Sequence, residues 1–216
     1  MKHVYGWALP DEDIHFEKYL EKSEEVFGRR IYQGTHIQTA LSATKARRVA
    51  LDIGAHVGFW SFYLAKYFAE VHAFEPVRAF GECFRENVKD RCVLLHETAL
   101  GNRAGFVEME VLMENSGMTH VKAGVKGSTP IEALDAFGIA DVDLVKIDVE
   151  GYERFVLEGA RRTLLRNKPV VIVEQKSGSD RYSIDKFTAL RYLERLGAEV
   201  MNKVVDDFIL GWPTKP

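Results

Sequence analysis

Four carboxylates that close apolar segments of the chain are the residues best placed for chemistry. They are Glu75, Asp148, Glu150 and Glu174. In an open α/β sheet, ligands bind beyond the carboxyl ends of the strands. A carboxylate there can accept hydrogen bonds from ligand hydroxyls, take a proton from a reacting hydroxyl or coordinate a divalent cation. The sequence therefore predicts that these acids gather at one ligand site.

One lysine accompanies three of these acids. Lys146 lies in the apolar run before Asp148 and Glu150, and strand alternation places the three side chains on one side. Carboxylates crowded at one edge of a sheet are costly unless a positive group meets them. Lys146, a cationic cofactor, a divalent metal or a shared proton would each meet that need. We predict Asp148, Glu150, Lys146 and Glu174 as catalytic residues, and the sequence does not choose the base or decide whether a metal is used.

A glycine turn with the sequence Asp-Ile-Gly-Ala-His-Val-Gly occupies residues 52–58. Gly54 and Gly58 lack a Cβ, so the chain can turn sharply and a ligand can approach the backbone closely. The free N–H groups of a helix that starts near Val57 point into the same space. Glu75 follows at about the 20-residue distance from which a carboxylate accepts hydrogen bonds from ribose hydroxyls. The segment therefore predicts a βα unit that binds a nucleoside or nucleotide.

The spacing of the glycines narrows the choice of ligand. Dinucleotide-binding folds use G-x-G-x-x-G, whereas Ala55 and His56 stand here where the second glycine belongs. This argues against NAD and favours S-adenosyl-L-methionine, which has no phosphate. Asp52 would then meet the cofactor's ammonium group or hold the loop. An NAD-dependent oxidoreductase and a turn without any ligand are the alternatives.

Strands and helices that could position these residues alternate along most of the chain. Apolar runs predict strands at 49–53, 71–75, 93–96, 144–148, 170–174, 199–204 and 208–212. Helical patterns occupy 59–68, 79–88 and 154–165. Continuous apolar runs are typical of parallel strands covered on both faces, so the alternation predicts a doubly wound α/β sheet. Two further helices, at 11–27 and 35–44, would form an N-terminal helical extension over residues 1–45 that acts as a lid.

A segment after the third strand interrupts this alternation. Residues 106–113 alternate apolar and acidic side chains, which predicts a half-buried antiparallel strand. With a turn at 115–117 and a return at 120–121, the segment reads as an inserted hairpin. His120 on this hairpin is an alternative base. It ranks below the carboxylates because an isolated histidine in a loop is more often at the surface.

Composition sets the broad class of the protein. The chain has 216 residues, 46% of them hydrophobic, which suits one α/β core. The net charge of −3 gives no global attraction for nucleic acid or anionic membranes, although Arg161, Arg162 and Arg166 form a local basic cluster. Two cysteines at unrelated positions indicate neither disulfides nor zinc. We expect a cytoplasmic protein without a membrane segment that acts on a small molecule or glycan and could form a homodimer.

Several motifs together resemble the FkbM family of S-adenosylmethionine-dependent methyltransferases. They are the turn at 52–58, Ala-Phe-Glu-Pro at 73–76, Asn87, Ala-Leu-Gly at 99–101, Lys-Ile-Asp-Val-Glu-Gly-Tyr-Glu at 146–153 and Leu-Glu-Gly-Ala at 157–160. The resemblance covers about residues 48–212. It implies a Rossmann-like, seven-stranded class I methyltransferase sheet, mostly parallel with an antiparallel C-terminal strand, in a domain at 46–216. It also implies methyl transfer, usually to oxygen, with S-adenosyl-L-homocysteine as the product.

The resemblance also implies roles for individual residues. Asp52, Gly54, His56 and Gly58 would line the methionine end of the cofactor, although many relatives have asparagine in place of His56. Glu75 would hold the ribose, Thr98, Ala99 and Leu100 would face the adenine, and Asp148 would meet the cofactor's amino group or the acceptor. Tyr32 and Gln33 would close over the cofactor's carboxylate. The expected acceptor is a hydroxyl of a small molecule or saccharide. An RNA ribose methyltransferase and a non-catalytic nucleoside-binding protein are the alternatives.

Overall fold

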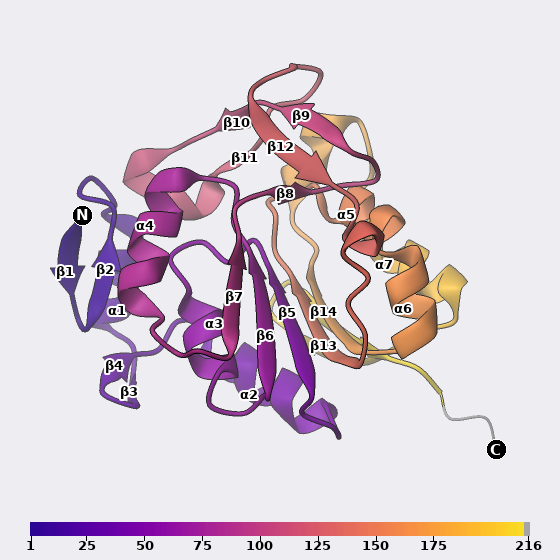
Figure 1. Ribbon diagram of the computed structural model, residues 1–216, viewed down its shortest axis with the longest axis horizontal. Coiled ribbons are helices and arrows are strands. Elements are labelled where there is room, and N and C mark those ends of the chain that lie inside the picture. The colour runs from indigo at the N-terminus through magenta and orange to yellow at the C-terminus, as the bar shows by residue number, and fades with distance from the viewer. Residues whose placement is uncertain (214–216) are drawn as a thin grey trace.

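A seven-stranded sheet forms the centre of the computed structural model, which describes residues 1–213 (Figure 1). Its strands lie in the order β15-β16-β14-β13-β5-β6-β7. Their bounds are β5 Val49–Ile53, β6 Glu70–Phe74, β7 Val93–His96, β13 Val142–Ile147, β14 Val170–Glu174, β15 Glu199–Val204 and β16 Asp207–Gly211. Strands β5, β6, β7, β13 and β14 run parallel to one another, and β16 runs antiparallel to both β14 and β15. The predicted mostly parallel sheet with an antiparallel C-terminal strand is confirmed.

Helices cover both faces of this sheet (Figure 1). One face packs against α2 Gly34–Ala43, α3 Phe59–Leu64 and α4 Arg78–Asn87, and the other packs against α5 Glu153–Gly159, α6 Arg161–Asn167 and α7 Thr188–Leu196. Each side has its own apolar core. Strand β5 is buried at all five positions, which explains why its sequence is continuously apolar except for Asp52.

The helices after β13 differ from the prediction in two ways. The helix predicted at 154–165 is divided at Ala160 into α5 and α6. A Cβ on Gly159 would lie 1.9 Å from the Gly101 carbonyl oxygen, so a close backbone contact accompanies this break. Helix α7 was absent from the prediction, although Ala189 and Leu193 bury one face of it at i,i+4 spacing.

The N-terminal segment is less helical than predicted. In place of one helix over 11–27 there is a short helix, α1 His15–Glu21, between two hairpins. The hairpins are β1 Lys2–Val4 with β2 Trp7–Leu9, and β3 Glu25–Val26 with β4 Arg29–Arg30. Phe27 and Gly28 both have positive φ, as a two-residue hairpin turn requires, so Gly28 turns a hairpin instead of ending a helix. The predicted helix at 35–44 is confirmed as α2.

The N-terminal segment and the sheet share one apolar core. Trp7, Phe16 and Ile37 belong to the same buried cluster as Ala50 and Val71 of the sheet. The predicted boundary between an N-terminal extension at 1–45 and a methyltransferase domain at 46–216 stays a prediction. Residues 214–216 of that domain lie outside the described part of the chain.

Short elements between β7 and β13 form a cap beyond the carboxyl ends of the strands (Figure 1). They are β8 Ala99–Leu100, β9 Gly105–Val107, β10 Met109–Glu110, the 3₁₀ helix η1 Met113–Met118, β11 His120–Val121, β12 Thr129–Glu132 and the 3₁₀ helix η2 Leu134–Phe137. The predicted hairpin exists as β10 and β11, with Met109 opposite Val121 and Glu110 opposite His120. It is shorter than expected because β9 pairs with β12 instead, and Val111 is exposed.

A last 3₁₀ helix, η3 Ser177–Tyr182, follows β14. Within residues 1–213, no helix has the length and apolar character needed to cross a membrane.

Candidate active site

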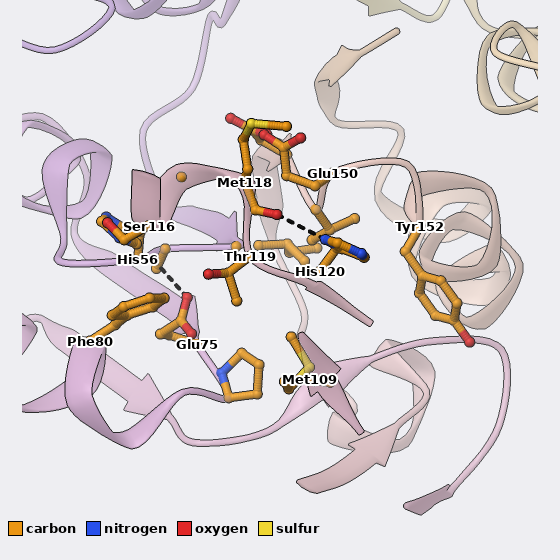
Figure 2. Close-up of a pocket in the computed structure, with 18 of the residues that line it drawn as sticks. His56, Glu75, Phe80, Met109, Ser116, Met118, Thr119, His120, Glu150 and Tyr152 are labelled. Carbon is orange, nitrogen blue, oxygen red and sulfur yellow. Dashed lines mark hydrogen bonds between the residues drawn. The ribbon is translucent and has the colours of Figure 1, made fainter. Parts of the chain in front are cut away.

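A cavity of about 360 Å³ lies where the sheet meets its cap (Figure 2). Its walls come from the loops after β5, β6 and β13, from β8, and from α1, η1 and β11. This is the carboxyl edge of the strands, where α/β sheets bind ligands. The volume lies within the range of small-molecule sites.

The glycine turn adopts the predicted sharp bend for packing reasons. Gly54 and Gly58 both have positive φ. A Cβ on Gly54 would lie 1.9 Å from the Asp148 carbonyl oxygen, and one on Gly58 would lie 2.7 Å from Val88. The close approaches that require glycine are therefore to other parts of the chain. Gly54 lines the cavity, whereas Gly58 begins α3 behind it.

Glu75 lies in the cavity wall with its carboxylate held by backbone amides. Oε2 accepts a hydrogen bond from the His56 N–H at 2.9 Å, and Oε1 accepts one from Val77 at 2.8 Å (Figure 2). The side chain is buried, and burial raises its pKa to about 7 despite these two bonds. Two N–H donors fix the orientation of this carboxylate, and each oxygen keeps a further lone pair for a ligand hydroxyl.

Asp52 lies below the cavity and is not among its lining residues. Its Oδ2 accepts a hydrogen bond from the Ser61 hydroxyl at 2.7 Å, and Lys146 Nζ is 3.4 Å from its Oδ1. Of the two roles predicted for Asp52, the geometry supports holding the loop.

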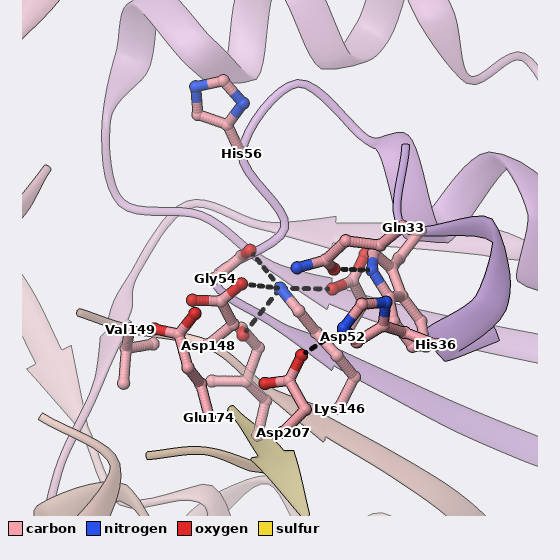
Figure 3. Close-up of polar contacts among 12 residues, drawn as sticks. Gln33, His36, Asp52, Gly54, His56, Lys146, Asp148, Val149, Glu174 and Asp207 are labelled. Atoms are coloured by element: carbon pink, nitrogen blue, oxygen red, sulfur yellow. Dashed lines mark hydrogen bonds and ion pairs between the residues drawn. The ribbon is translucent and has the colours of Figure 1, made fainter. Parts of the chain in front are cut away.

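Lys146 connects the glycine turn to the acids after β13 (Figure 3). Its Nζ donates to the Gly54 carbonyl at 2.7 Å and lies 4.0 Å from Asp148 Oδ2. Burial opposes the charge of Lys146, but the carboxylates of Asp52 and Asp148 outweigh it and raise its pKa. The ammonium group is therefore charged and positions the loop between two carboxylates.

The structure brings together three of the predicted catalytic acids. Oxygens of Asp148, Glu150 and Glu174, which we call the acidic cluster, lie within 4.8 Å of one another. Burial and the neighbouring acids raise the pKa of Glu150 to about 7 and that of Glu174 to about 10. Lys176, which the sequence analysis did not select, forms an ion pair with Glu174. Asp148 and Glu150 line the cavity, and Glu174 lies behind them.

His56 joins the glycine turn to the cap and to the N-terminal segment. Its Nε2 lies 2.7 Å from the Ser116 hydroxyl, which in turn donates to Asp13. Because the Ser116 proton is committed to a carboxylate, His56 Nε2 must be the donor to Ser116. Nδ1 is then unprotonated, and burial lowers the pKa of His56 to about 3. This line of bonds, which we call the Asp13–Ser116–His56 relay, fixes α1 and η1 over the turn.

The structure places His120 inside the protein and not at its surface. This residue is buried, with 7% of its surface exposed, and lines the cavity (Figure 2). Its Nδ1 lies 2.9 Å from the Met118 carbonyl oxygen. A carbonyl only accepts, so Nδ1 carries the proton and Nε2 keeps its lone pair. The expectation of a surface histidine was wrong because the β10–β11 hairpin folds over the cavity.

The remaining predicted residues divide into two groups. Thr98, Ala99, Leu100 and Tyr32 line the cavity as expected. Gln33 does not, since its side-chain oxygen accepts a hydrogen bond from Trp60 at 2.7 Å. Phe16, Phe80, Asp13 and Ser116 were missed. No local pattern marks them, because each contributes through contacts between distant segments.

Comparison with known proteins shows the family to which this chain belongs. A family description, "Methyltransferase FkbM domain", matches residues 52–200. The chain belongs to the FkbM methyltransferase family. It is 27% identical over 204 residues to the hexuronic acid methyltransferase AglP of Haloferax volcanii, covering 89% of this chain and 82% of that protein. The resemblance found in the sequence is thus confirmed.

Solved structures of methyltransferases share the fold. A Methylobacillus flagellatus FkbM methyltransferase aligns with 90% of the chain at a TM-score of 0.53 and 15% identity. The chain spans 50% of that protein's length. A Streptococcus mutans methyltransferase in complex with SAH aligns with 82% of this chain and 93% of its own, at a TM-score of 0.52 and 10% identity. These similarities support the class I methyltransferase fold.

The residues of the cavity fit the cofactor of this family. Glu75 offers an oriented carboxylate for ribose hydroxyls, and the 98–100 segment offers a largely apolar wall for a base. Asp148 offers a negative charge, and Lys146 beside it offers a positive one, for an amino-acid moiety. Polar groups for both ends of an adenosyl amino acid therefore surround one cavity.

Proposed function

We propose that this protein transfers a methyl group from S-adenosyl-L-methionine to a hydroxyl oxygen of a saccharide. The observation that carries the proposal is the buried Glu75 carboxylate, oriented by two N–H donors at the wall of a cavity in an FkbM fold. A saccharide is favoured as acceptor because AglP, a relative that aligns along most of the chain, is a hexuronic acid methyltransferase.

The protein's part in this reaction is positioning and proton transfer. S-adenosyl-L-methionine supplies an activated methyl group when bound. Glu75 would hold the ribose, the 98–100 segment would cover the adenine, and Asp148 with Lys146 would orient the amino-acid end. In-line placement of the acceptor oxygen then supplies most of the acceleration.

His120 is the base that the geometry favours. Its Nε2 lone pair is free because Nδ1 donates to Met118, and its ring lines the cavity. Glu110 Oε2 lies 3.8 Å from Nε2 and would stabilise the imidazolium formed when His120 takes the acceptor proton. By contrast, Lys146 and Lys176 already engage Asp148 and Glu174.

The RNA alternative has less support. Arg161, Arg162 and Arg166 lie on α6, and none of them lines the cavity. Arg162 is bonded to Asp135 at the start of that helix. These three arginines therefore do not form a basic surface that could lead the phosphates of an RNA into the proposed site.

Three measurements test the proposal. Calorimetry should show binding of S-adenosyl-L-methionine and S-adenosyl-L-homocysteine, and labelled methyl groups should pass to glycans, with hexuronate-containing ones tested first. His120→Asn should lower kcat about 10²-fold or more with little change in cofactor affinity. Absence of binding to both cofactor forms would favour the non-catalytic alternative, and labelling of RNA alone would overturn the saccharide acceptor.

A further inference from the structure

The acidic cluster holds more negative charge than its surroundings neutralise. Together with Asp52, its three members make four carboxylates, and the ammonium groups that contact them are those of Lys146 and Lys176. When all are ionised, these six groups have a net charge of −2, and the Arg181 guanidinium, which donates to the Glu150 carbonyl oxygen at 2.9 Å, reduces the excess to −1. Buried carboxylates in such excess are unfavourable unless a cation or protons compensate them.

One oxygen of the cluster is buried and has no partner. Glu174 is only 2% exposed, and within the described residues its Oε2 accepts no hydrogen bond. Lys176 pairs with Oε1 and not with Oε2, and the Glu174 side chain lies beside that of Asp148 (Figure 3). A buried acceptor without a donor is rare in folded proteins, so this atom indicates a missing partner, which is a bound cation or a proton shared with the neighbouring carboxylates.

The spacing of the oxygens suits a cation. Two ligands of one ion lie at most twice the metal–oxygen distance apart. That limit is about 4.2 Å for Mg²⁺ and about 4.8 Å for Ca²⁺. The cluster oxygens lie within 4.8 Å of one another, so a small closing of the side chains would bring all three to one Ca²⁺, Mg²⁺ or Mn²⁺ ion. An all-oxygen donor set favours these hard cations over zinc or copper.

The backbone supports this arrangement at the loop after β13. Glu150 and Gly151 both have positive φ. A Cβ on Gly151 would lie 2.2 Å from the backbone of Gly178, so the loop packs directly on the segment after Lys176. The three carboxylates are thus held by two adjacent strand ends that contact each other.

We propose that the acidic cluster binds one hard divalent cation of the Mg²⁺, Mn²⁺ and Ca²⁺ class at the floor of the cavity. Asp148 and Glu150 line the cavity, so an ion on them would face the acceptor. A divalent ion there would bind the acceptor hydroxyl and lower its pKa, which would make proton transfer to His120 easier. This role toward the acceptor rests on the proposed function, whereas ion binding does not.

Manganese binding to chelator-treated full-length protein, without cofactor or acceptor, tests the site. Electron paramagnetic resonance of free Mn²⁺ should show one saturable site per chain, and Mg²⁺ should compete for it. Glu174→Gln and Glu150→Gln should each weaken binding ~10-fold or more. The matched control Glu199→Gln changes an exposed acid on β15 and should leave binding unchanged.

Two results would overturn the proposal: no saturable Mn²⁺ binding by the unaltered protein, or unchanged binding in both cluster variants. Either result would mean that shared protons compensate the cluster. Thermal melting shows whether each variant folds, and Glu150→Gln changes a loop residue, so it tests the site even if the strand variant unfolds. Failure of the methyl-transfer proposal would instead appear as absent S-adenosyl-L-homocysteine binding, which this experiment does not involve.

Discussion

Two sets of buried acids on the same edge of the sheet are stabilised in opposite ways. Glu75, after β6, is held by backbone N–H groups, and within residues 1–213 no lysine or arginine forms an ion pair with it. The acids at β5, β13 and β14 face the side-chain ammonium groups of Lys146 and Lys176. Burial nevertheless raises the pKa of Glu75 and that of Glu150 to about 7.

The two kinds of partner suggest two different roles for these acids. Backbone donors cannot move away, so Glu75 is fixed for one geometry, as the ribose recognition proposed for it would require. Lysine side chains can shift, so the acids beside them can change partners when a cation or substrate enters. The following predictions test whether fixed and exchangeable partners have these separate consequences.

The largest expected effect is on stability, at Lys146. Lys146→Met should lower the free energy of unfolding by about 3 kcal/mol or more, because it leaves the buried Asp52 without its cation. Urea unfolding would measure the change. The control Lys89→Met removes a lysine that is 67% exposed and should cost less than about 1 kcal/mol. Adding Asp52→Asn to Lys146→Met should restore part of the loss, and no restoration would contradict the charge-pair explanation.

At Glu75 the expected effect is on binding. Glu75→Gln should weaken S-adenosyl-L-methionine binding by about 1–3 kcal/mol, because one charged acceptor for the ribose is lost. Calorimetry would measure the affinity. Glu97→Gln, which alters an acid 45% exposed on the same side of the sheet, is the control. Equal affinities for Glu75→Gln and the unaltered protein would remove Glu75 from the site.

The pH dependence of stability gives a smaller effect at the same residue. The pKa of Glu75 is about 7 in the folded protein, against an ordinary value near 4.5. The folded state therefore holds a proton that the unfolded chain has lost, and Glu75 makes stability fall as pH rises from 4.5 through 7. His56, with a lowered pKa of about 3, acts in the opposite direction but only below about pH 6.5.

Glu150 and Glu153 also have pKa values of about 7, so the effect of Glu75 between pH 6.5 and 8 is the difference between the unaltered protein and a Glu75 variant. Without cofactor, Glu75→Gln should reduce the loss of stability over this window by about 1 kcal/mol. Thermal or urea unfolding at the two pH values would measure it. The variant should thus be more stable than the unaltered protein at pH 8 while it binds cofactor less well. An identical pH profile would show that the Glu75 carboxyl titrates normally.

The central sheet was predictable from sequence because burial on both faces leaves a continuous apolar signal. Strands β5 and β14 were predicted residue for residue, and Glu75 and Glu174 were placed at the correct edge. The N-terminal hairpins were not predictable in this way. Their strands have two or three residues, too few to show a period.

The site was predictable only where its residues sit at strand ends. Asp52 was correctly placed at the glycine turn. That its side chain lies below the cavity and contacts Lys146 could not be predicted from the spacing of the motif. The burial of His120 was not predicted, because burial of a loop residue depends on how the cap folds. Asp13 and Ser116 are 103 residues apart, and no local pattern connects them.

The smallest expected effect is that of removing the contact between Asp13 and Ser116. It compares a carboxylate held by a side-chain hydroxyl with the acids held by backbone donors and by lysines. Ser116→Ala should break the Asp13–Ser116–His56 relay and cost about 1 kcal/mol of stability. The neighbouring Asn115 and Thr119 remain as polar groups in the cap. Because the relay fixes α1 and η1 over the turn that also holds Glu75, the dissociation rate of cofactor should rise. Stopped-flow displacement would measure this rate, with Ser23→Ala as the control, because the Ser23 hydroxyl lies outside the cavity and donates to the Tyr19 carbonyl. If dissociation were unchanged while stability fell, the relay would serve folding alone, and backbone donors would suffice to keep the Glu75 carboxylate in place.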